Sequence, residues 1–310
     1  MFSLKKILGV GSADVDFVIG VRQAPELGET IRCRSFRKTC GGKGANQAYA
    51  CGRLGGDTAF LNAVGDDPLG GELVRNLQQA NVDTRAIRTV DGVSTGMAVV
   101  CVDEKGNNSI IVIPGANNLC DVDYLRRNRA RFEESDIVLL QMEIPFESVC
   151  YAVELASGLH KTVILNPAPA PDSLPDEVYA GLDYLTPNES EFKRLTGCPT
   201  DEVEELAVHC KPLLEKGTRN IIITLGSRGA LHVNREGHTL YRPPKVQAVD
   251  TTAAGDTCNA ALARELADGR STEEAIVFAN MASALAVSRV GAQDSIPSYE
   301  EVLDFKKRME

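Results

Sequence analysis

Short apolar runs alternate along most of this chain with longer segments of helical periodicity. A strand that is repeatedly followed by a helix needs crossover connections, so the pattern predicts a doubly wound α/β fold with a mostly parallel sheet and helices on both faces. The predicted strands are Ile7–Val10, Thr58–Ala63, Asp136–Gln141, Thr162–Asn166, Tyr184–Pro187 and Asn220–Leu225. The predicted helices are Asn46–Leu54, Gly71–Ala80, Phe146–Gly158, Glu189–Thr196, Asp201–Lys216, Asp256–Ala267, Ser271–Arg289 and Ser298–Lys307.

Four further runs are strand-like, polar at alternate positions, and not separated by helices: Asp16–Val21, Thr30–Thr39, Thr95–Asp103 and Ser109–Pro114. The segment Glu104–Asn108 between the last two is a plausible hairpin turn. These runs predict a small antiparallel β layer beside the main domain, suited to act as a lid. The expected division is a main domain of residues 1–15, 40–94 and 115–310, and a lid of residues 16–39 and 95–114.

Charge and cysteine content limit the classes of partner. The chain of 310 residues carries 33 Lys and Arg against 43 Asp and Glu, a net charge of −10, which argues against binding to nucleic acid or anionic membranes. No apolar run is long enough for a membrane span, and Met1–Val10 resembles a first strand more than a secretion signal. Nine cysteines without a C-x-x-C pair favour reduced thiols and a cytoplasmic protein.

The segment Gly9–Asp14 begins like a dinucleotide-binding fingerprint. Asp14 replaces the third glycine, and no helix is predicted directly after it, so an oxidoreductase is disfavoured. Asp14 and Asp16 share one face of an extended chain, where two carboxylates can hold sugar hydroxyls. A solvated turn is the alternative for this pair.

Two other glycine loops follow predicted strands. Gly41–Gln47 precedes a helix and lacks the Walker A pattern; its glycines permit close approach to a ligand, or simply a tight turn before the helix. Thr224–Gly229 fits either a phosphate-binding loop or a plain β-turn, and this motif alone does not distinguish the two.

The segment Asp250–Thr257 is the most informative. Small residues lead into a helix predicted to start near Asp256, and the free N–H groups of a helix start form an anion hole. An acid at this place can be a helix cap. Here the preceding small residues leave room for a phosphate, which favours Asp256 as a general base for phosphoryl transfer to a hydroxyl.

Five motifs together resemble the ribokinase branch of the PfkB carbohydrate kinase family, in the same order and nearly from end to end. They are GGKGANQA (Gly41–Ala48), NPAPA (Asn166–Ala170), TPNESE (Thr186–Glu191), TLGSRG (Thr224–Gly229) and DTTAAGDT (Asp250–Thr257). The resemblance implies transfer of the γ-phosphoryl group of ATP to a pentose-like sugar, ribose to ribose 5-phosphate. It also implies Mg²⁺, a monovalent cation such as K⁺, and a homodimer formed through the lid.

The same resemblance implies roles for individual residues. Asp256 matches the base, and Ala253, Ala254 and Gly255 match the anion hole. Sugar contacts are implied for Asp14, Asp16, Gly42, Lys43, Asn46, Glu143 and Asp256. ATP contacts are implied for Asn188, Thr224, Gly226, Ser227, Gly229, Gly255 and Asn280. Glu191 matches a residue that acts on magnesium indirectly, and the matching monovalent-cation positions are Asp250, Thr252, Ala286, Arg289, Gly291 and Ser295.

One position departs from the family pattern, because ribokinases typically have Asn where this chain has Asp14. An ionised Asp only accepts hydrogen bonds, whereas a protonated one can donate as Asn does. Alternatives to ribose therefore stay open: deoxyribose, another sugar or a nucleoside, or a sugar-binding relative without catalysis.

Overall fold

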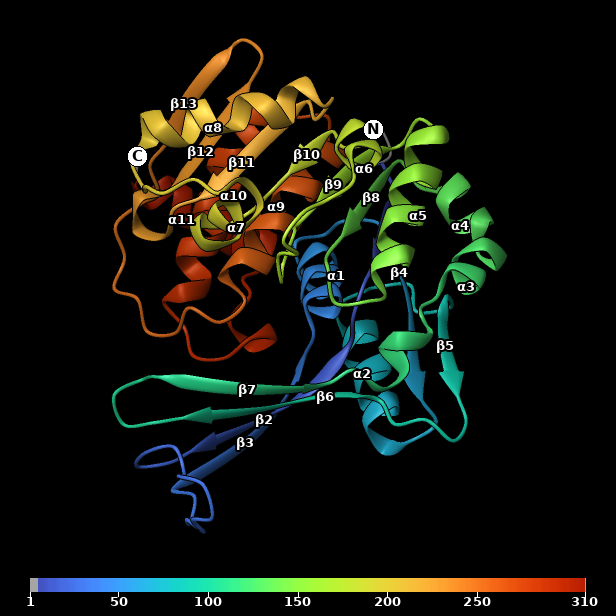
Figure 1. Cartoon of the computed structure of the whole chain (residues 1–310), viewed down its shortest axis with the longest axis vertical. Coiled ribbons are helices and arrows are strands. Elements are labelled where there is room, and N and C mark those ends of the chain that lie inside the picture. The colour runs from blue at the N-terminus through green and yellow to red at the C-terminus, as the bar shows by residue number, and fades with distance from the viewer. Residues whose placement is uncertain (1–4, 310) are drawn as a thin grey trace.

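The computed structural model describes residues 5–309 and contains a nine-stranded sheet in the order β13-β12-β11-β10-β9-β8-β1-β4-β5 (Figure 1). All neighbours from β11 to β5 pair in parallel, whereas β11-β12-β13 is an antiparallel edge. The predicted mostly parallel α/β fold is confirmed. The strands are β1 Ile7–Val10, β4 Thr58–Gly65, β5 Ile87–Val90, β8 Ile137–Leu140, β9 Thr162–Leu165, β10 Tyr184–Leu185, β11 Asn220–Thr224, β12 Ala230–Asn234 and β13 Gly237–Tyr241. Met1 to Leu4, within the predicted N-terminal segment, lie outside the described residues.

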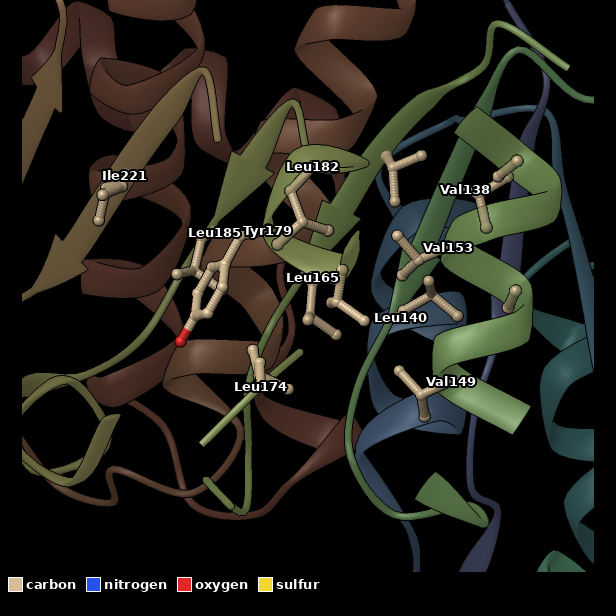
Figure 2. Packing of buried hydrophobic residues seen from close by; sticks show 14 of the residues in the cluster. Val138, Leu140, Val149, Val153, Leu165, Leu174, Tyr179, Leu182, Leu185 and Ile221 are labelled. Carbon is tan, nitrogen blue, oxygen red and sulfur yellow. The ribbon is translucent and has the colours of Figure 1, made fainter. Parts of the chain in front are cut away.

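Helices cover both faces of this sheet because successive strand residues point to opposite sides. Val138 and Leu140 of β8 pack toward α5, as Figure 2 shows, while Ile137 and Leu139 pack on the opposite face. One face carries α3 Val122–Arg127, α4 Arg129–Glu134, α5 Phe146–Gly158, α6 Asp176–Ala180, α7 Glu189–Thr196 and α8 Val203–Glu215. The other carries α1 Lys43–Arg53, α9 Ala254–Ala267, α10 Thr272–Val287 and α11 Tyr299–Met309, and α2 Pro68–Gln79 packs in a third cluster.

A second sheet, in the order β3-β2-β6-β7, projects from the main body (Figure 1). The predicted antiparallel pairing holds for β2–β3 and β6–β7 but is wrong for the central pair β2–β6, which is parallel. The reason is connectivity. Strand β3 returns the chain to the end of the sheet where β2 starts, and after α1, β4, α2 and β5 the chain re-enters at that same end, so β6 runs in the direction of β2. The strands are β2 Asp14–Gly20, β3 Ser35–Gly41, β6 Gly96–Val102 and β7 Asn108–Ile113.

Strand β3 begins later than the predicted strand Thr30–Thr39. Residues 30–34 are irregular and the strand begins at Ser35. The hairpin turn between β6 and β7 forms as predicted: Asp103 accepts from the backbone N–H of Lys105 at 2.9 Å and of Asn107 at 2.8 Å. Gly106 takes the positive φ of 83° that this turn requires.

The outer strand β7 is apolar and open to solvent. Ile110, Ile111 and Val112 are 55%, 66% and 56% exposed. Among residues 5–309, no helix combines the length and the apolar character that crossing a membrane would need. All nine cysteines are unpaired.

Candidate active site

Asp256 lies in the first turn of α9, three residues after the N-cap rather than at the cap itself. The helix begins at Ala254, two residues earlier than predicted, and Ala253 is the N-cap residue with a left-handed φ of 57°. The alternative that Asp256 merely caps the helix is therefore wrong. Its side chain is buried and faces α1 instead.

Two neutral amides hold the Asp256 carboxylate. Asn46 Nδ2 donates to Oδ2 at 3.0 Å, and Gln47 Nε2 donates to Oδ1 at 2.9 Å. Both donors come from the first turns of α1, which begins at Lys43, three residues before the predicted start. Asn46 was a predicted site residue, but Gln47 was not.

The start of α9 is open to a ligand. None of the described side chains caps this helix, and a Cβ atom built on Gly255 would meet no atom within 4 Å. The early N–H groups of a helix carry partial positive charge and need acceptors. Ala253, Ala254 and Gly255 therefore form a small surface without a side-chain cap, directly beside Asp256, where the N–H of Ala254 donates to the Thr251 carbonyl at 3.3 Å.

Glu143 ties the first loop to α1. Its Oε2 accepts from the backbone N–H of Lys43 at 2.9 Å and from Ser12 Oγ at 2.5 Å. Gly41 and Gly42 make close contacts possible here: a side chain at Gly41 would collide with the Asp16 carboxylate, and Gly42 has a φ of 83° beside Asp14.

Crowding of carboxylates changes their proton affinity. Burial, followed by repulsion from Glu143, raises the pKa of Asp14 to about 7. Burial, then Glu143 and then Asp256, raise the pKa of Asp16 to about 6. Burial alone would lower the pKa of Lys43, but the surrounding carboxylates, led by Asp256, raise it. Asp14 and Asp16 therefore bind their protons more tightly than free carboxyl groups do, and Lys43 is held in its charged form among them.

Asn117 is a site residue that the sequence did not indicate. Its Nδ2 donates to Asp14 Oδ1 at 2.6 Å, while its Oδ1 accepts from the backbone of Ala13 at 2.9 Å and from Asn62 Nδ2 at 3.1 Å. These contacts join residues far apart in the sequence: Asn117 is 103 positions from Asp14 and 55 from Asn62. No local spacing pattern signals them.

The predicted nucleotide residues converge at the carboxyl ends of β10 and β11. Asn188 and Thr224 form a parallel β-bridge. Gly226 and Ser227 lie in an exposed 3₁₀ turn. Gly229 and Asn280 meet at Tyr241, because a side chain at Gly229 would collide with the Tyr241 carbonyl and Asn280 Nδ2 donates to it at 2.9 Å.

The Asn188 and Glu191 pair forms the capping box of α7. Glu191 Oε2 accepts from the Asn188 backbone and Oε1 from Asn188 Nδ2, both at 2.8 Å. Burial raises the pKa of Glu191, and Lys43 and Asp256 are the charged side chains of the site that act on it. The motif therefore borders the Asp256 cluster, with its carboxylate oxygens already engaged.

Asp250 joins two segments predicted to hold a monovalent cation. Its Oδ1 accepts from the Thr252 backbone at 2.9 Å and from Thr252 Oγ1 at 2.6 Å, and its Oδ2 accepts from the Gly291 backbone at 3.0 Å. Ser295 lies buried just beyond Gly291. The Ala286 carbonyl accepts from the Arg289 backbone at 3.0 Å, and the Arg289 side chain pairs with Glu301.

A hollow of about 640 Å³ lies elsewhere, between α8 and the β12–β13 hairpin. Its lining includes Lys211, Arg235 and His238 and none of the predicted site residues. The candidate site is thus identified by its convergent hydrogen bonds rather than by the size of a cavity.

The chain resembles known proteins over almost its full length. It is 38% identical to the ribokinase of Haemophilus influenzae over 302 residues, 97% of this chain and 98% of that protein. It is 34% identical to the deoxyribokinase of Salmonella typhimurium over 296 residues, 96% of this chain and 97% of that protein. The solved structure of Arabidopsis thaliana ribokinase complexed with ribose and ATP superposes with a TM-score of 0.90 at 32% identity, covering 99% of both chains. The pfkB family carbohydrate kinase pattern matches residues 4–299, and the chain therefore belongs to the pfkB family of carbohydrate kinases.

Proposed function

We propose that this member of the family transfers the γ-phosphoryl group of ATP to a hydroxyl of a pentose-like sugar, with ribose as the first candidate. One observation carries the proposal: the Asp256 carboxylate, held by neutral amides, lies beside an uncapped helix start. This places a proton acceptor next to donors for the charge that develops on a transferred phosphoryl group. The similarity to ribokinases supports ribose as the acceptor.

In this proposal the sugar binds among Asp14, Asp16, Gly42, Lys43, Asn46 and Glu143. Asp256 orients the attacking hydroxyl and takes its proton as the new O–P bond forms. The N–H groups at Ala253–Gly255 bind the phosphoryl oxygens while the bond to ADP breaks, so most of the catalysis is positioning and electrostatics. ATP lies along Asn188, Thr224, Gly226, Ser227, Gly229 and Asn280.

Two metal ions complete the proposal. Magnesium supplies positive charge on the ATP phosphates. The Glu191 oxygens are bonded to Asn188, so Glu191 would act on magnesium through water. For K⁺, Asp250, Thr252 and the backbone carbonyls of Ala286, Arg289, Gly291 and Ser295 offer only oxygen donors, which suits this cation. The bond between Asp250 and Gly291 supports one shared site.

The small sheet, residues 16–39 and 95–114, is the proposed lid and homodimer contact. Its exposed strand β7 and the stacked rings of Phe17 and Phe36, 6.1 Å apart, offer an apolar surface for a second copy. A lid also keeps water from the phosphoryl group. We place the protein in the cytoplasm, in keeping with its nine unpaired thiols.

The test is ADP release with a panel of ribose, 2-deoxyribose, other pentoses, hexoses and nucleosides, with ATP and Mg²⁺, with and without K⁺. We expect ADP release to depend on sugar and to be highest with a pentose. A protein that binds a sugar without ADP release would be the non-catalytic relative and would refute the proposal. A strong preference for deoxyribose is the second candidate, favoured by Asp14 and by the similarity to a deoxyribokinase.

A further inference from the structure

A chain of three amides reaches Asp256 from the far side of α1. Asn76 of α2 donates through Nδ2 to Gln293 Oε1. Gln293 Nε2 donates to Asn46 Oδ1 at 2.9 Å, and Asn46 Nδ2 donates to Asp256 Oδ2 at 3.0 Å. The members come from widely separated parts of the sequence: Gln293 and Asn46 are 247 positions apart.

A second chain reaches the other oxygen. Gln141, directly after β8, donates through Nε2 to Gln47 Oε1 at 2.6 Å. Gln47 Nε2 then donates to Asp256 Oδ1 at 2.9 Å and to Asn166 Oδ1 at 3.2 Å. Gln47 and Gln141 are fully buried, so water does not compete for these bonds.

Both chains run in one direction, with every NH₂ group turned toward Asp256. An amide can present either its NH₂ group or its oxygen, whereas an ionised carboxylate only accepts. At the outer end of the second chain, Gln141 Oε1 is buried and has no hydrogen-bond partner among the described residues. The orientation of the amides is therefore set by Asp256. Its carboxylate accepts from the NH₂ groups of Asn46 and Gln47, and the outer amides follow the same orientation.

We propose that Gln293 and Gln141 are positioning residues for Asp256, acting through Asn46 and Gln47 to fix both carboxylate oxygens for proton transfer. The inference rests on the proposed function, in which Asp256 is the base. A carboxylate with one donor on each oxygen cannot rotate about its Cβ–Cγ bond without losing both bonds. Its reactive lone pair then keeps one direction relative to the sugar hydroxyl.

Reversing the first chain is the sharpest test, because it changes polarity without changing shape. Asn76→Asp and Gln293→Glu each replace a donor by an acceptor. Gln293→Glu would draw the Asn46 NH₂ group toward itself and turn the Asn46 oxygen toward Asp256. Gln293→Met and Asn76→Ala remove the contact without imposing this reversal and are the matched controls.

We expect Gln293→Glu and Asn76→Asp to lower kcat about tenfold or more, the range of a lost hydrogen bond to a charged group, while the KM for the sugar changes little. The controls should lose less. Assays use saturating K⁺, because Gln293 lies between two candidate cation positions, and thermal unfolding of each variant shows whether it is folded. Asn76 is only half-buried, so we expect its variants to fold. They can be used for the test if a change at Gln293 prevents folding.

The pH profile separates positioning from packing. Asp256 acts on the pKa values of Lys43 from α1, Asp16 from β2 and Glu191 from α7, and none of these groups is altered by the variants. A carboxylate that loses a donor binds its proton more tightly, so the acid limb of the kcat profile should move to higher pH in the reversed variants. The added negative charge acts in the same direction, but Asn76 lies one hydrogen bond further from Asp256 than Gln293 does. Reversal of the chain therefore predicts similar shifts for Asn76→Asp and Gln293→Glu, whereas charge alone predicts a smaller shift for Asn76→Asp.

The outcomes are distinguishable. If Asp256→Asn is inactive and the reversed variants have wild-type kcat and pH profiles, the positioning role is refuted and the proposed function stands. If the reversed variants and the controls lose activity equally, with unchanged pH profiles, the role is packing and the inference is again refuted. If Asp256→Asn retains near-normal turnover, the base assignment itself fails.

Discussion

Asn117 donates to Asp14 at 2.6 Å and so joins the 3₁₀ turn after β7 to the first residue of β2. Asn117 donates to Oδ1 of Asp14, so Oδ2 is the oxygen that can contact a sugar. Burial, followed by repulsion from Glu143, raises the pKa of this carboxyl to about 7. A carboxyl that is half protonated near neutral pH can donate or accept. Asn at this position would accept from Asn117 equally well and always present a donor.

Asp14→Asn should therefore change the choice of sugar more than the chemistry. We expect the variant to gain activity with ribose relative to deoxyribose, and its KM for ribose to lose most of its pH dependence between pH 6 and 8, the region around the Asp14 pKa of about 7. The measurement is kcat/KM for both sugars across this range. Identical profiles for variant and wild type would show that Asp14 does not select the substrate.

The raised pKa values of Asp14 and Asp16 also predict how stability depends on pH. The folded protein keeps protons up to about pH 7 and about pH 6 that the unfolded chain releases near 3.8. The free energy of unfolding should therefore fall as pH rises from about 4 to 7, by on the order of 1 kcal/mol for each tenfold difference in proton affinity between the folded and unfolded states. Thermal unfolding should show Asp14→Asn gaining stability over wild type along this interval. A constant difference between the two proteins would contradict it.

Asp256→Asn should reduce turnover by several orders of magnitude and leave sugar affinity within a few fold, because an amide cannot take the hydroxyl proton. ADP release measures turnover, and calorimetric titration of the sugar measures affinity. Asp304→Asn on the exposed side of α11 is the matched control. Near-normal ADP release from the Asp256 variant would assign the base elsewhere.

Asp250→Ala should weaken activation by K⁺, because it removes a candidate ligand and the bond that holds Gly291 near Thr252. We expect the K⁺ concentration for half activation to rise about tenfold or more, in line with the loss of a charge-assisted contact. Activity is measured at increasing KCl with ionic strength held constant by a salt of a large organic cation. An unchanged K⁺ curve would remove Asp250 from the site.

Ile111→Asp should dissociate the proposed homodimer. Ile111 is 66% exposed on β7, so a charge there costs the fold little, whereas it would be costly inside an apolar interface. Sedimentation velocity compares wild type and variant at the same concentration, and circular dichroism checks that the fold is retained. If the wild-type protein is a monomer, β7 is not a homodimer contact.

Local signals account for the parts of the fold that the sequence predicted well. Helices α5 and α7 have the predicted ends, and the capping box of Asn188 and Glu191 explains the sharp start of α7. Strand β1 also has its predicted bounds, because a fully buried strand is a continuous apolar run. Strands β5, β12 and β13 were missed; β5 and β13 lie at the sheet edges, where the apolar pattern is weaker.

From the residues alone, site positions were indicated where glycine and small residues mark a loop, whereas Glu143 and Asn280 were indicated only by the family resemblance. Gln47, Gln141, Gln293 and Asn117 were missed because their partners are distant in the sequence, as the separation of 209 between Gln47 and Asp256 shows. A buried amide has no periodicity of its own. The single available signal was the position of Gln47 directly after Asn46, inside the glycine-loop motif.

The parallel pairing of β2 with β6 has a consequence for how the small sheet can move. The sheet is not an appendage on one hinge, because the chain leaves it at Gly41, builds α1 through β5, and re-enters it at Gly96. Its two innermost strands start at the proposed sugar site, with Asp14 opposite both Gly41 and Gly96. A displacement of the sheet would therefore be transmitted to the start of α1, which carries Asn46 and Gln47, the two donors to Asp256. Deleting the small sheet would also remove β2, which carries Asp14 and Asp16, two of the proposed sugar contacts.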